Sequence, residues 1–231
     1  MEPALARSLS VQLQISLDYV VREYYEMGLL KELFESPYAT QFVFKGGTAL
    51  RLVYQSPRFS EDLDFDVIGA IDTTAFFGFL SHVGKHFPAI KSVETADKFH
   101  TLFALLRVQD PVLDRAFSIK FEASKRRASD LPTTAFTDQI IRSPVTPLTA
   151  LARVATREQI LREKTAALGS RKVARDLFDW WYLHQLQREE VVPDVTGFDR
   201  EDALAELHKL LPRPYWRVID TWFASAPQPS S

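Results

Sequence analysis

The last six residues of the segment FKGGTALRLVYQSPRFSEDLDFDV, which covers residues 44–67, constrain the fold more than any other part of the chain. From Asp62 to Val67, aspartates alternate with apolar residues, and a period of two is typical of a β-strand. The aspartates, Asp62, Asp64 and Asp66, would then share one face, while the apolar residues face a core. The pattern predicts a sheet with a carboxylate-rich polar face.

A glycine pair precedes that strand by about one helix length. Gly46 and Gly47 end a short apolar element, QFVFKGG, and Thr48 begins TALRLVYQ, whose apolar residues recur at helical spacing. Glycines let a backbone approach a phosphate closely, and the first N–H groups of a helix point toward a bound anion. The pair and Thr48, which can donate its hydroxyl, are therefore candidates for phosphate binding.

The pattern after this segment predicts both helices and strands in the first part of the chain. Helical spacing covers residues 5–35 and again 73–87. Two runs rich in Phe, Leu and Ile, 99–109 and 115–124, suit an antiparallel strand pair because Asp110-Pro111 separates them.

The prolines of RSPVTPLTA, residues 142–150, predict a linker. After the linker, and with a break at Gly169, we expect helices at 156–168, 170–187, 199–211 and 214–225. The prediction is an α/β (α+β) fold with a small mixed sheet in a core lobe, 1–141, followed by a helical lobe, 142–231.

Composition excludes several classes of protein. With 46% hydrophobic and 25% charged residues the chain is typical of a folded protein, and the lack of cysteine excludes disulfides and thiolate metal sites. The N-terminal segment lacks the uninterrupted apolar core of a signal peptide. The longest apolar run, residues 73–84, has about half the length that spans a bilayer. We expect a cytoplasmic protein without a membrane partner.

The formal net charge of −2 argues against a nucleic-acid partner, but the basic residues are unevenly distributed. Residues 111–190 carry 14 basic and 10 acidic side chains, which gives this part a net charge of +4. Clustered basic residues can follow a phosphate backbone, although solvated surface charge is the alternative. The candidates for RNA binding are Lys125, Arg126, Arg127, Arg171 and Lys172.

Two carboxylates on one face of a strand repel each other unless a cation lies between them. Mg²⁺ binds through one or two carboxylates together with substrate phosphates, and a pair of such ions supports nucleotidyl displacement. Asp62 and Asp64 are therefore candidate ligands of Mg²⁺ or Mn²⁺. An EF-hand is excluded because Val67 and Thr73 stand where its loop needs glycine and glutamate. A P-loop is excluded because Lys45 precedes the glycines. A solvated edge strand beside a tight turn is the alternative.

The stretches FKGGTAL and RFSEDLDF resemble the AbiEii family of nucleotidyltransferase toxins, which includes the MenT toxins. This family belongs to the DNA polymerase β-like nucleotidyltransferase superfamily, in which a glycine pair and a short helix precede D-x-D on a strand. The resemblance implies that Asp62 and Asp64 bind the metal and that Gly46, Gly47 and Thr48 contact the triphosphate.

The same resemblance assigns three further residues. Lys45 and Ser60 belong to the same two stretches and are expected at the nucleotide. The superfamily often has a third carboxylate on a later strand. Glu122, on the polar face of SIKFEAS, is the candidate for that metal ligand, and an ordinary solvated glutamate is the alternative.

A second stretch, EKTAALGSRKVARDLFDWWYL at residues 163–183, is similar to the same family. The family carries a lysine, a short gap and then R-D-x-x-D, as Lys164, Arg175, Asp176 and Asp179 do here. The resemblance implies that Lys164 contacts the nucleotide phosphates and that an aspartate orients the site, but the spacing leaves open which one. We place Lys164 and Asp179 among the catalytic residues and Arg175 and Asp176 at the nucleotide. A surface helix with an ion pair is the alternative.

Together the patterns predict a metal-dependent nucleotidyltransferase with a polymerase β-like core lobe. It would transfer NMP from an NTP to an acceptor hydroxyl and release pyrophosphate, mainly by positioning and charge neutralisation. The resemblance implies that the acceptor is the 3′ end of tRNA and that the protein is the toxin of a toxin–antitoxin pair with a cognate antitoxin. The alternatives are a protein or small-molecule acceptor, or a non-catalytic nucleotide-binding module.

Overall fold

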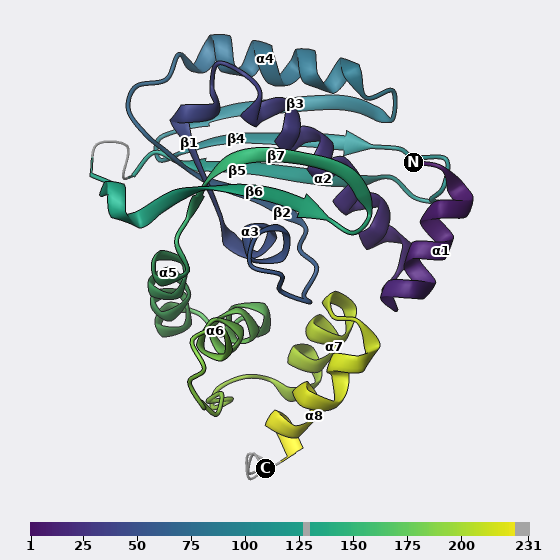
Figure 1. Ribbon diagram of the computed structural model, residues 1–231, viewed down its shortest axis with the longest axis vertical. Coiled ribbons are helices and arrows are strands. Elements are labelled where there is room, and N and C mark those ends of the chain that lie inside the picture. The colour runs from purple at the N-terminus through teal and green to yellow at the C-terminus, as the bar shows by residue number, and fades with distance from the viewer. Residues whose placement is uncertain (127–129, 225–231) are drawn as a thin grey trace.

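A seven-stranded mixed sheet forms the centre of the larger lobe in the computed structural model, which describes residues 1–126 and 130–224 (Figure 1). Its strands are β1 (Phe42–Lys45), β2 (Asp62–Val67), β3 (Ile90–Lys98), β4 (Thr101–Val108), β5 (Phe117–Ser124), β6 (Phe136–Ser143) and β7 (Thr146–Ala155). They lie in the order β3-β4-β5-β2-β1-β7-β6. The pairs β2–β5 and β1–β7 are parallel, whereas the other neighbours are antiparallel. The predicted α/β class and mixed sheet are confirmed.

In the described part of the chain, four α-helices precede β3 and four follow β7. They are α1 (Pro3–Leu13), α2 (Leu17–Phe34), α3 (Gly46–Leu52), α4 (Thr73–His86), α5 (Arg157–Ser170), α6 (Ala174–Leu186), α7 (Arg200–Leu210) and α8 (Trp216–Ala224). None of the helices in the described ranges combines the length and the apolar composition that crossing a bilayer requires.

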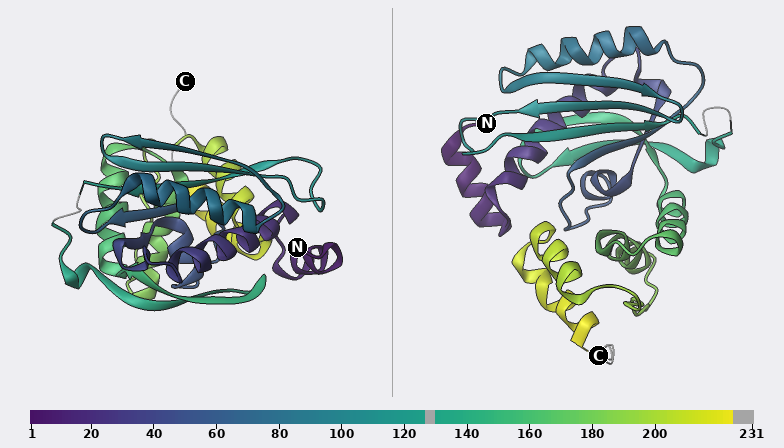
Figure 2. Two further views of the ribbon diagram at one scale, coloured as in Figure 1. Left: turned by 90° about the horizontal axis from the view of Figure 1, so that it is seen from above. Right: turned by 180° about the vertical axis from the view of Figure 1, so that it is seen from behind.

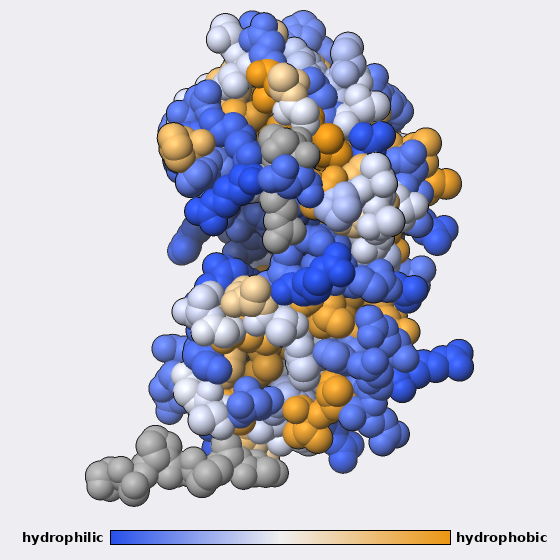
Figure 3. Space-filling model, turned by 90° about the vertical axis from the view of Figure 1, so that its left-hand side faces the viewer, coloured by the Kyte–Doolittle hydropathy of each residue, from blue (hydrophilic) through white to orange (hydrophobic). Residues whose placement is uncertain are grey.

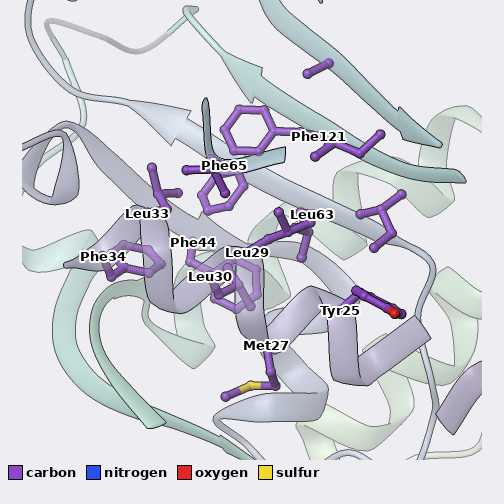
Figure 4. Packing of buried hydrophobic residues seen from close by; sticks show 14 of the residues in the cluster. Tyr25, Met27, Leu29, Leu30, Leu33, Phe34, Phe44, Leu63, Phe65 and Phe121 are labelled. Atoms are coloured by element: carbon purple, nitrogen blue, oxygen red, sulfur yellow. The ribbon is translucent and has the colours of Figure 1, made fainter. Parts of the chain in front are cut away.

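The main hydrophobic core lies on one face of the sheet, where residues of α2 pack against residues of β1, β2 and β5 (Figure 4). Leu33 of α2 and Leu80 of α4 belong to the same buried cluster as Phe65 of β2 and Phe121 of β5. The rings of Phe65 and Phe121 stack with their centroids 4.5 Å apart. The apolar residues of β2 face this core, as their alternation predicts, and the aspartates are left for the opposite face.

Helices α5–α8 form a smaller lobe on the side of the molecule away from α4 (Figures 1 and 2). Phe178, Leu207 and Phe223 of α6, α7 and α8 are at most 2% exposed and make its core. The Phe59 N–H donates to the Leu210 carbonyl over 2.8 Å, so the loop before β2 is tied directly to α7.

The predicted linker at 142–150 is wrong. These residues complete β6 and begin β7, which form an antiparallel hairpin, and β7 also pairs with β1. Pro144 lies in the hairpin turn and Pro147 near the start of β7, where a missing N–H removes little strand pairing. The predicted boundary between residues 141 and 142 falls within this hairpin. The division into lobes 1–141 and 142–231 therefore stays a prediction.

Most other predicted elements are confirmed with shifted ends. The helix expected at 5–35 is two helices, because Gln14 adopts a left-handed conformation (φ 53°) and ends α1. α5 continues through Gly169 to Ser170, so the break before α6 falls at residues 171–173. The prediction lacks β3 and β6. All residues of β3 are exposed or half-buried, which weakens the apolar alternation of a strand.

Candidate active site

Three acidic side chains lie on one face of the neighbouring strands β2 and β5. In the parallel register, Asp62 lies opposite Lys120 and Asp64 opposite Glu122. The Lys120 ammonium lies 3.0 Å from Asp62 Oδ2 and 3.1 Å from Glu122 Oε2. Carboxylates from two strands therefore share one cation. We call Asp62, Asp64, Lys120 and Glu122 the carboxylate face.

Asp64 is the most enclosed acid of the carboxylate face. Burial, and then the charge of Asp62, raise the pKa of Asp64 to about 6, although Lys164 and Lys120 act against this shift. Gly46 lies directly against this carboxylate: its φ is +76°, and a Cβ there would lie 2.5 Å from Asp64 Oδ2. Only glycine allows this backbone conformation at so close an approach.

The second glycine packs against the loop that leads into β2. A Cβ on Gly47 would collide with the Arg58 guanidinium and would lie 2.8 Å from Ser60 Oγ. Thr48 is buried, and its hydroxyl donates to the backbone carbonyl of Asp62. The glycine turn is therefore fixed to the start of the acidic strand, and Thr48 uses its hydroxyl within the protein.

A cluster of paired charges, almost fully buried, connects the glycine turn to the helical lobe. Arg58 donates through Nε and Nη2 to the two carboxylate oxygens of Asp179 on α6, each over 2.7 Å. Lys164 Nζ of α5 lies 2.6 Å from Asp179 Oδ2 and 2.7 Å from Asp176 Oδ1. Arg58 and both aspartates are at most 1% exposed. We call Arg58, Lys164, Asp176 and Asp179 the buried network.

The buried network compensates its own charges. Burial alone would raise the pKa of Asp179, but the charges of Arg58 and Lys164 hold it below its ordinary value. Burial would lower the pKa of Lys164, whereas Asp179 and Asp176 raise it above its ordinary value. Arg58, Lys164 and Asp179 are therefore ionised at neutral pH. Asp179 is the aspartate that also binds Arg58, whose guanidinium packs against Gly47 of the glycine turn.

Lys45 joins β1 to β2 and α5. It lies opposite Asp64 in the strand register, but its ammonium is 2.8 Å from Asp66 Oδ1 and 3.2 Å from Glu163 Oε2. Burial would lower the pKa of Lys45, and the charges of Glu163 and Asp66 raise it above its ordinary value. These contacts hold the start of the glycine turn against the helical lobe.

The structure does not bring every predicted site residue to this place. Arg175 pairs with Glu206 of α7 over 2.8 Å and lies apart from the carboxylate face. Arg171 is half exposed and reaches the buried network at Asp176 over 2.8 Å. Lys172 lies over an aromatic ring of the helical lobe.

Two candidates for RNA binding, Lys125 and Arg126, directly follow the C-terminal end of β5. Lys125 pairs with Asp97 of β3, and Arg126 is exposed. Arg127 lies outside the residues that the structure describes. Viewed from the side, the surface is hollowed between the two lobes, and mostly hydrophilic residues surround the hollow (Figure 3).

The carboxylate face fits a hard divalent cation by the chemistry of its donors. Within residues 1–126 and 130–224, no three acidic or histidine side chains already converge as a complete set of metal ligands. Mg²⁺ does not need such a set, because it completes its shell with water and substrate phosphates. Asp62 and Asp64 offer the one or two carboxylates required, and the position of Lys120 indicates that a cation can be shared between Asp62 and Glu122.

Two residues that the sequence interpretation did not assign are central here. Arg58 lies within the RFSEDLDF stretch, and a charged residue between apolar neighbours was the available signal. Lys120 lies on the polar side of the alternation in SIKFEAS, but its contact with Asp62 depends on the register of two strands far apart in sequence. Neither contact follows from spacing alone.

Comparison with known proteins gives a family and several similar structures. The family model described as "Nucleotidyl transferase AbiEii toxin, Type IV TA system" matches residues 28–208. The crystal structure of JHP933 from Helicobacter pylori is similar with a TM-score of 0.57 and 26% identity, covering 74% of this chain and 68% of that one. The structure of MenT4, the nucleotidyltransferase toxin Rv2826c from Mycobacterium tuberculosis H37Rv, is similar in fold, with a TM-score of 0.60, 18% identity and coverage of 99% of this chain and 91% of that one. No curated protein matches the chain in sequence.

Proposed function

The chain belongs to the AbiEii family of nucleotidyltransferase toxins, and from that premise we propose that it transfers NMP from an NTP to the 3′-terminal hydroxyl of a tRNA in a metal-dependent reaction. The family makes the chain a nucleotidyltransferase of a toxin–antitoxin system, with an NTP as substrate and a cognate antitoxin as partner. The tRNA acceptor, the metal and the roles of individual residues are the parts that we propose.

One observation carries the proposal: Asp64 stands between a glycine turn and a second carboxylate strand. Gly46 lies against its carboxyl group on one side, and Glu122 lies opposite it on β5. A triphosphate at the turn would therefore lie beside the oxygens of Asp62 and Asp64. This arrangement supports charge neutralisation at a phosphate that undergoes substitution.

The chain's own residues have separate tasks in this proposal. Asp62 and Asp64, with Glu122 as the third ligand, hold Mg²⁺ or Mn²⁺. Such an ion, when bound, neutralises the phosphate oxygens and lowers the cost of charge that develops on the attacking and leaving oxygens. The backbone of Gly46 and Gly47 lets the triphosphate lie close to the acids.

Lys164 is the cation of the buried network that stands within electrostatic reach of the carboxylate face, since it lowers the pKa of Asp64. We infer that it interacts with the phosphates of the bound nucleotide from this position. Asp179 holds Lys164 and Arg58 in place and therefore acts as a positioning residue. Lys164 forms an ion pair with Asp176 as well as with Asp179.

The reaction forms one bond and breaks one bond at the α-phosphorus. The acceptor hydroxyl oxygen attacks this atom, the bond to the β-phosphate oxygen breaks, and pyrophosphate leaves. The hydroxyl proton passes to a carboxylate of the site or to solvent. Catalysis depends on alignment of the three groups and on electrostatic stabilisation.

Transfer of label tests this function. The protein is incubated with each of the four α-labelled NTPs, with and without Mg²⁺, and with total tRNA, and the products are separated on a denaturing gel. We expect label at the position of tRNA only with the divalent cation. Label on the protein or on its antitoxin, with unlabelled tRNA, would reject the RNA acceptor and favour a protein hydroxyl. Nucleotide binding without transfer would favour a non-catalytic module.

A further inference from the structure

The sheet continues past the acids as a surface that the proposed chemistry does not use. Across β5 and β4, Glu122 lies opposite Phe103, and Phe103 lies opposite Ala96 of β3. Asp64, Glu122 and Phe103 therefore form one row on the same face of the sheet. Neighbouring strands are about 4.8 Å apart, so the backbone at Phe103 lies roughly 10 Å from that at Asp64.

This part of the sheet is open to solvent. Leu102, Ala104 and Leu106 of β4 are at most 1% exposed and face the core beneath α4. The alternate residues Phe103 and Leu105 point to the other side and are half-buried. Neither belongs to a hydrophobic core cluster of the described residues. The protein thus presents an aromatic ring and a leucine on a polar surface beside its acids.

Basic side chains stand at both ends of this apolar strip. Lys98 lies opposite Thr101 at one end, with its ammonium 4.1 Å from the centroid of the Phe103 ring. Arg107 lies at the other end and is exposed. Glu94 is the one acid that β3 and β4 place on this face. The strip is about six residues long, or roughly 20 Å, which matches a few nucleotides.

The turn between β3 and β4 adds a second exposed aromatic group. Phe99 is 88% exposed, and its ring lies against that of His100, 4.4 Å between centroids. The His100 carbonyl accepts the backbone N–H of Lys125, which places Lys125 beside this turn. Aromatic and basic side chains are thus brought together from two segments.

We propose that the surface formed by Lys98, Phe103, Leu105 and Arg107, the β3–β4 platform, binds the single-stranded 3′ end of the acceptor RNA. Phe103 stacks on a base near the 3′ end, while Lys98 leaves the ring and follows a phosphate together with Arg107. Aromatic stacking accepts any base, and cations at both ends suit a polyanion. The platform gives the acceptor a direct path to the acids in the same row. This inference rests on the proposed RNA acceptor, and it names the surface that holds it.

A fluorescent oligoribonucleotide tests the platform. The probe is a short single strand with 2-aminopurine at its 3′-terminal position, because the emission of this base changes when it stacks. It is titrated into the wild type, Phe103→Leu, Phe103→Trp and Tyr215→Leu. Phe103→Leu keeps an apolar side chain and removes the ring, and Phe103→Trp restores stacking. Tyr215, which is 40% exposed in the helical lobe, is the matched aromatic control.

We expect Phe103→Leu to bind the probe about tenfold more weakly and to lose the emission change. Phe103→Trp and Tyr215→Leu should behave like the wild type. Melting temperature and NTP affinity should be equal in all four proteins. A double replacement of Lys98 and Arg107 by alanine should flatten the slope of log affinity against log salt by about 0.7 per lost phosphate contact.

Three outcomes would overturn the platform, and they are distinguishable. If the wild type binds the probe and Phe103→Leu gives the same affinity and emission, RNA is bound elsewhere and the proposed function stands. If the wild type binds NTP but neither the probe nor tRNA, the RNA acceptor itself is wrong. If Phe103→Leu binds RNA normally but is no longer neutralised by the antitoxin, the surface is an antitoxin-binding site.

Discussion

The carboxylate face and the buried network lie within electrostatic reach of each other, but their charges are balanced in different ways. In the buried network, Arg58 and Lys164 meet two aspartates at distances of 2.6–2.7 Å, and the acids are at most 1% exposed. On the carboxylate face, Asp62 and Glu122 share Lys120, and both of these side chains are about one-third exposed. A buried pair that loses one partner is strongly destabilised, whereas a half-exposed acidic surface can exchange its cation. The first region is built to hold its geometry and the second to receive a ligand.

Removal of the central acid of the buried network should have the largest effect on stability. Asp179→Ala leaves Arg58 and Lys164 without their shared anion, and we expect a loss of about 3–5 kcal/mol in the free energy of unfolding. Urea denaturation measures it. The control is Asp220→Ala, which removes a half-exposed partner of His208 and should cost less than about 1 kcal/mol. Equal losses in both variants would mean that the network is no more structural than a surface pair.

The difference in the free energy of unfolding between the wild type and Asp179→Ala should depend on pH in one direction only. Asp179 has a folded-state pKa below its ordinary value, so its contribution is present above the unfolded value of about 3.9. It is lost as the pH falls through the folded pKa. The stability gap between the wild type and Asp179→Ala should therefore be constant near neutrality and narrow only in acid.

On the carboxylate face, we expect a substitution to reduce activity and to leave stability unchanged. Asp64→Asn should reduce transfer by about a thousandfold, because metal-assisted neutralisation contributes several kcal/mol to the transition state. The melting temperature without metal should be unchanged or slightly higher, since the substitution relieves repulsion from Asp62. Asp138→Asn, at an exposed position of β6, is the control and should retain full activity. Wild-type transfer by Asp64→Asn would remove this acid from the site.

Substitution of Lys120 tests whether its ammonium competes with the metal ion for Asp62 and Glu122. Lys120→Met removes the ammonium shared by Asp62 and Glu122, so Mn²⁺ should bind about tenfold more tightly in the absence of nucleotide. Electron paramagnetic resonance of free Mn²⁺ gives the affinity. Lys91→Met, at an exposed position of β3, should leave it unchanged. Unchanged binding by Lys120→Met would show that the metal does not compete with this ammonium.

The smallest expected effect concerns a buried acid of α2. Glu26 of α2 is 1% exposed, and within the described ranges its Oε1 has no hydrogen-bond partner. Burial raises its pKa well above the ordinary value. The folded protein keeps a proton that the unfolded chain releases, so this group makes stability fall as the pH rises above about 4.3. Glu26→Gln should reduce that fall, and melting at pH 5 and pH 8 measures it. If the melting temperature changes between pH 5 and pH 8 by the same amount in Glu26→Gln as in the wild type, Glu26 is ionised in the folded protein.

The two regions also differ in how far the sequence predicts them. Asp62 and Asp64 follow from the period-two pattern of β2, and Glu122 from the polar side of β5, because alternation fixes a face whatever the partner strand is. The contacts of Arg58 depend on a helix 121 residues later, so no local pattern carries them. The same limit explains the missed hairpin. Pro144 and Pro147 indicate a linker locally, while the pairing of β7 with β1 is a long-range contact.

Localised cleavage of the chain by bound iron tests whether the carboxylate face holds the catalytic cation. Fe²⁺ is substituted for Mg²⁺, and ascorbate with peroxide then generates radicals that cut the backbone next to the ion. We expect fragments that end near Asp62–Asp64 and near Glu122, suppressed by excess Mg²⁺ and absent in Asp64→Asn. Cleavage centred elsewhere, with no cuts at β2 and β5, would contradict a metal ion on the carboxylate face. One such place is the pair His82 and His86 of α4, whose rings contact each other.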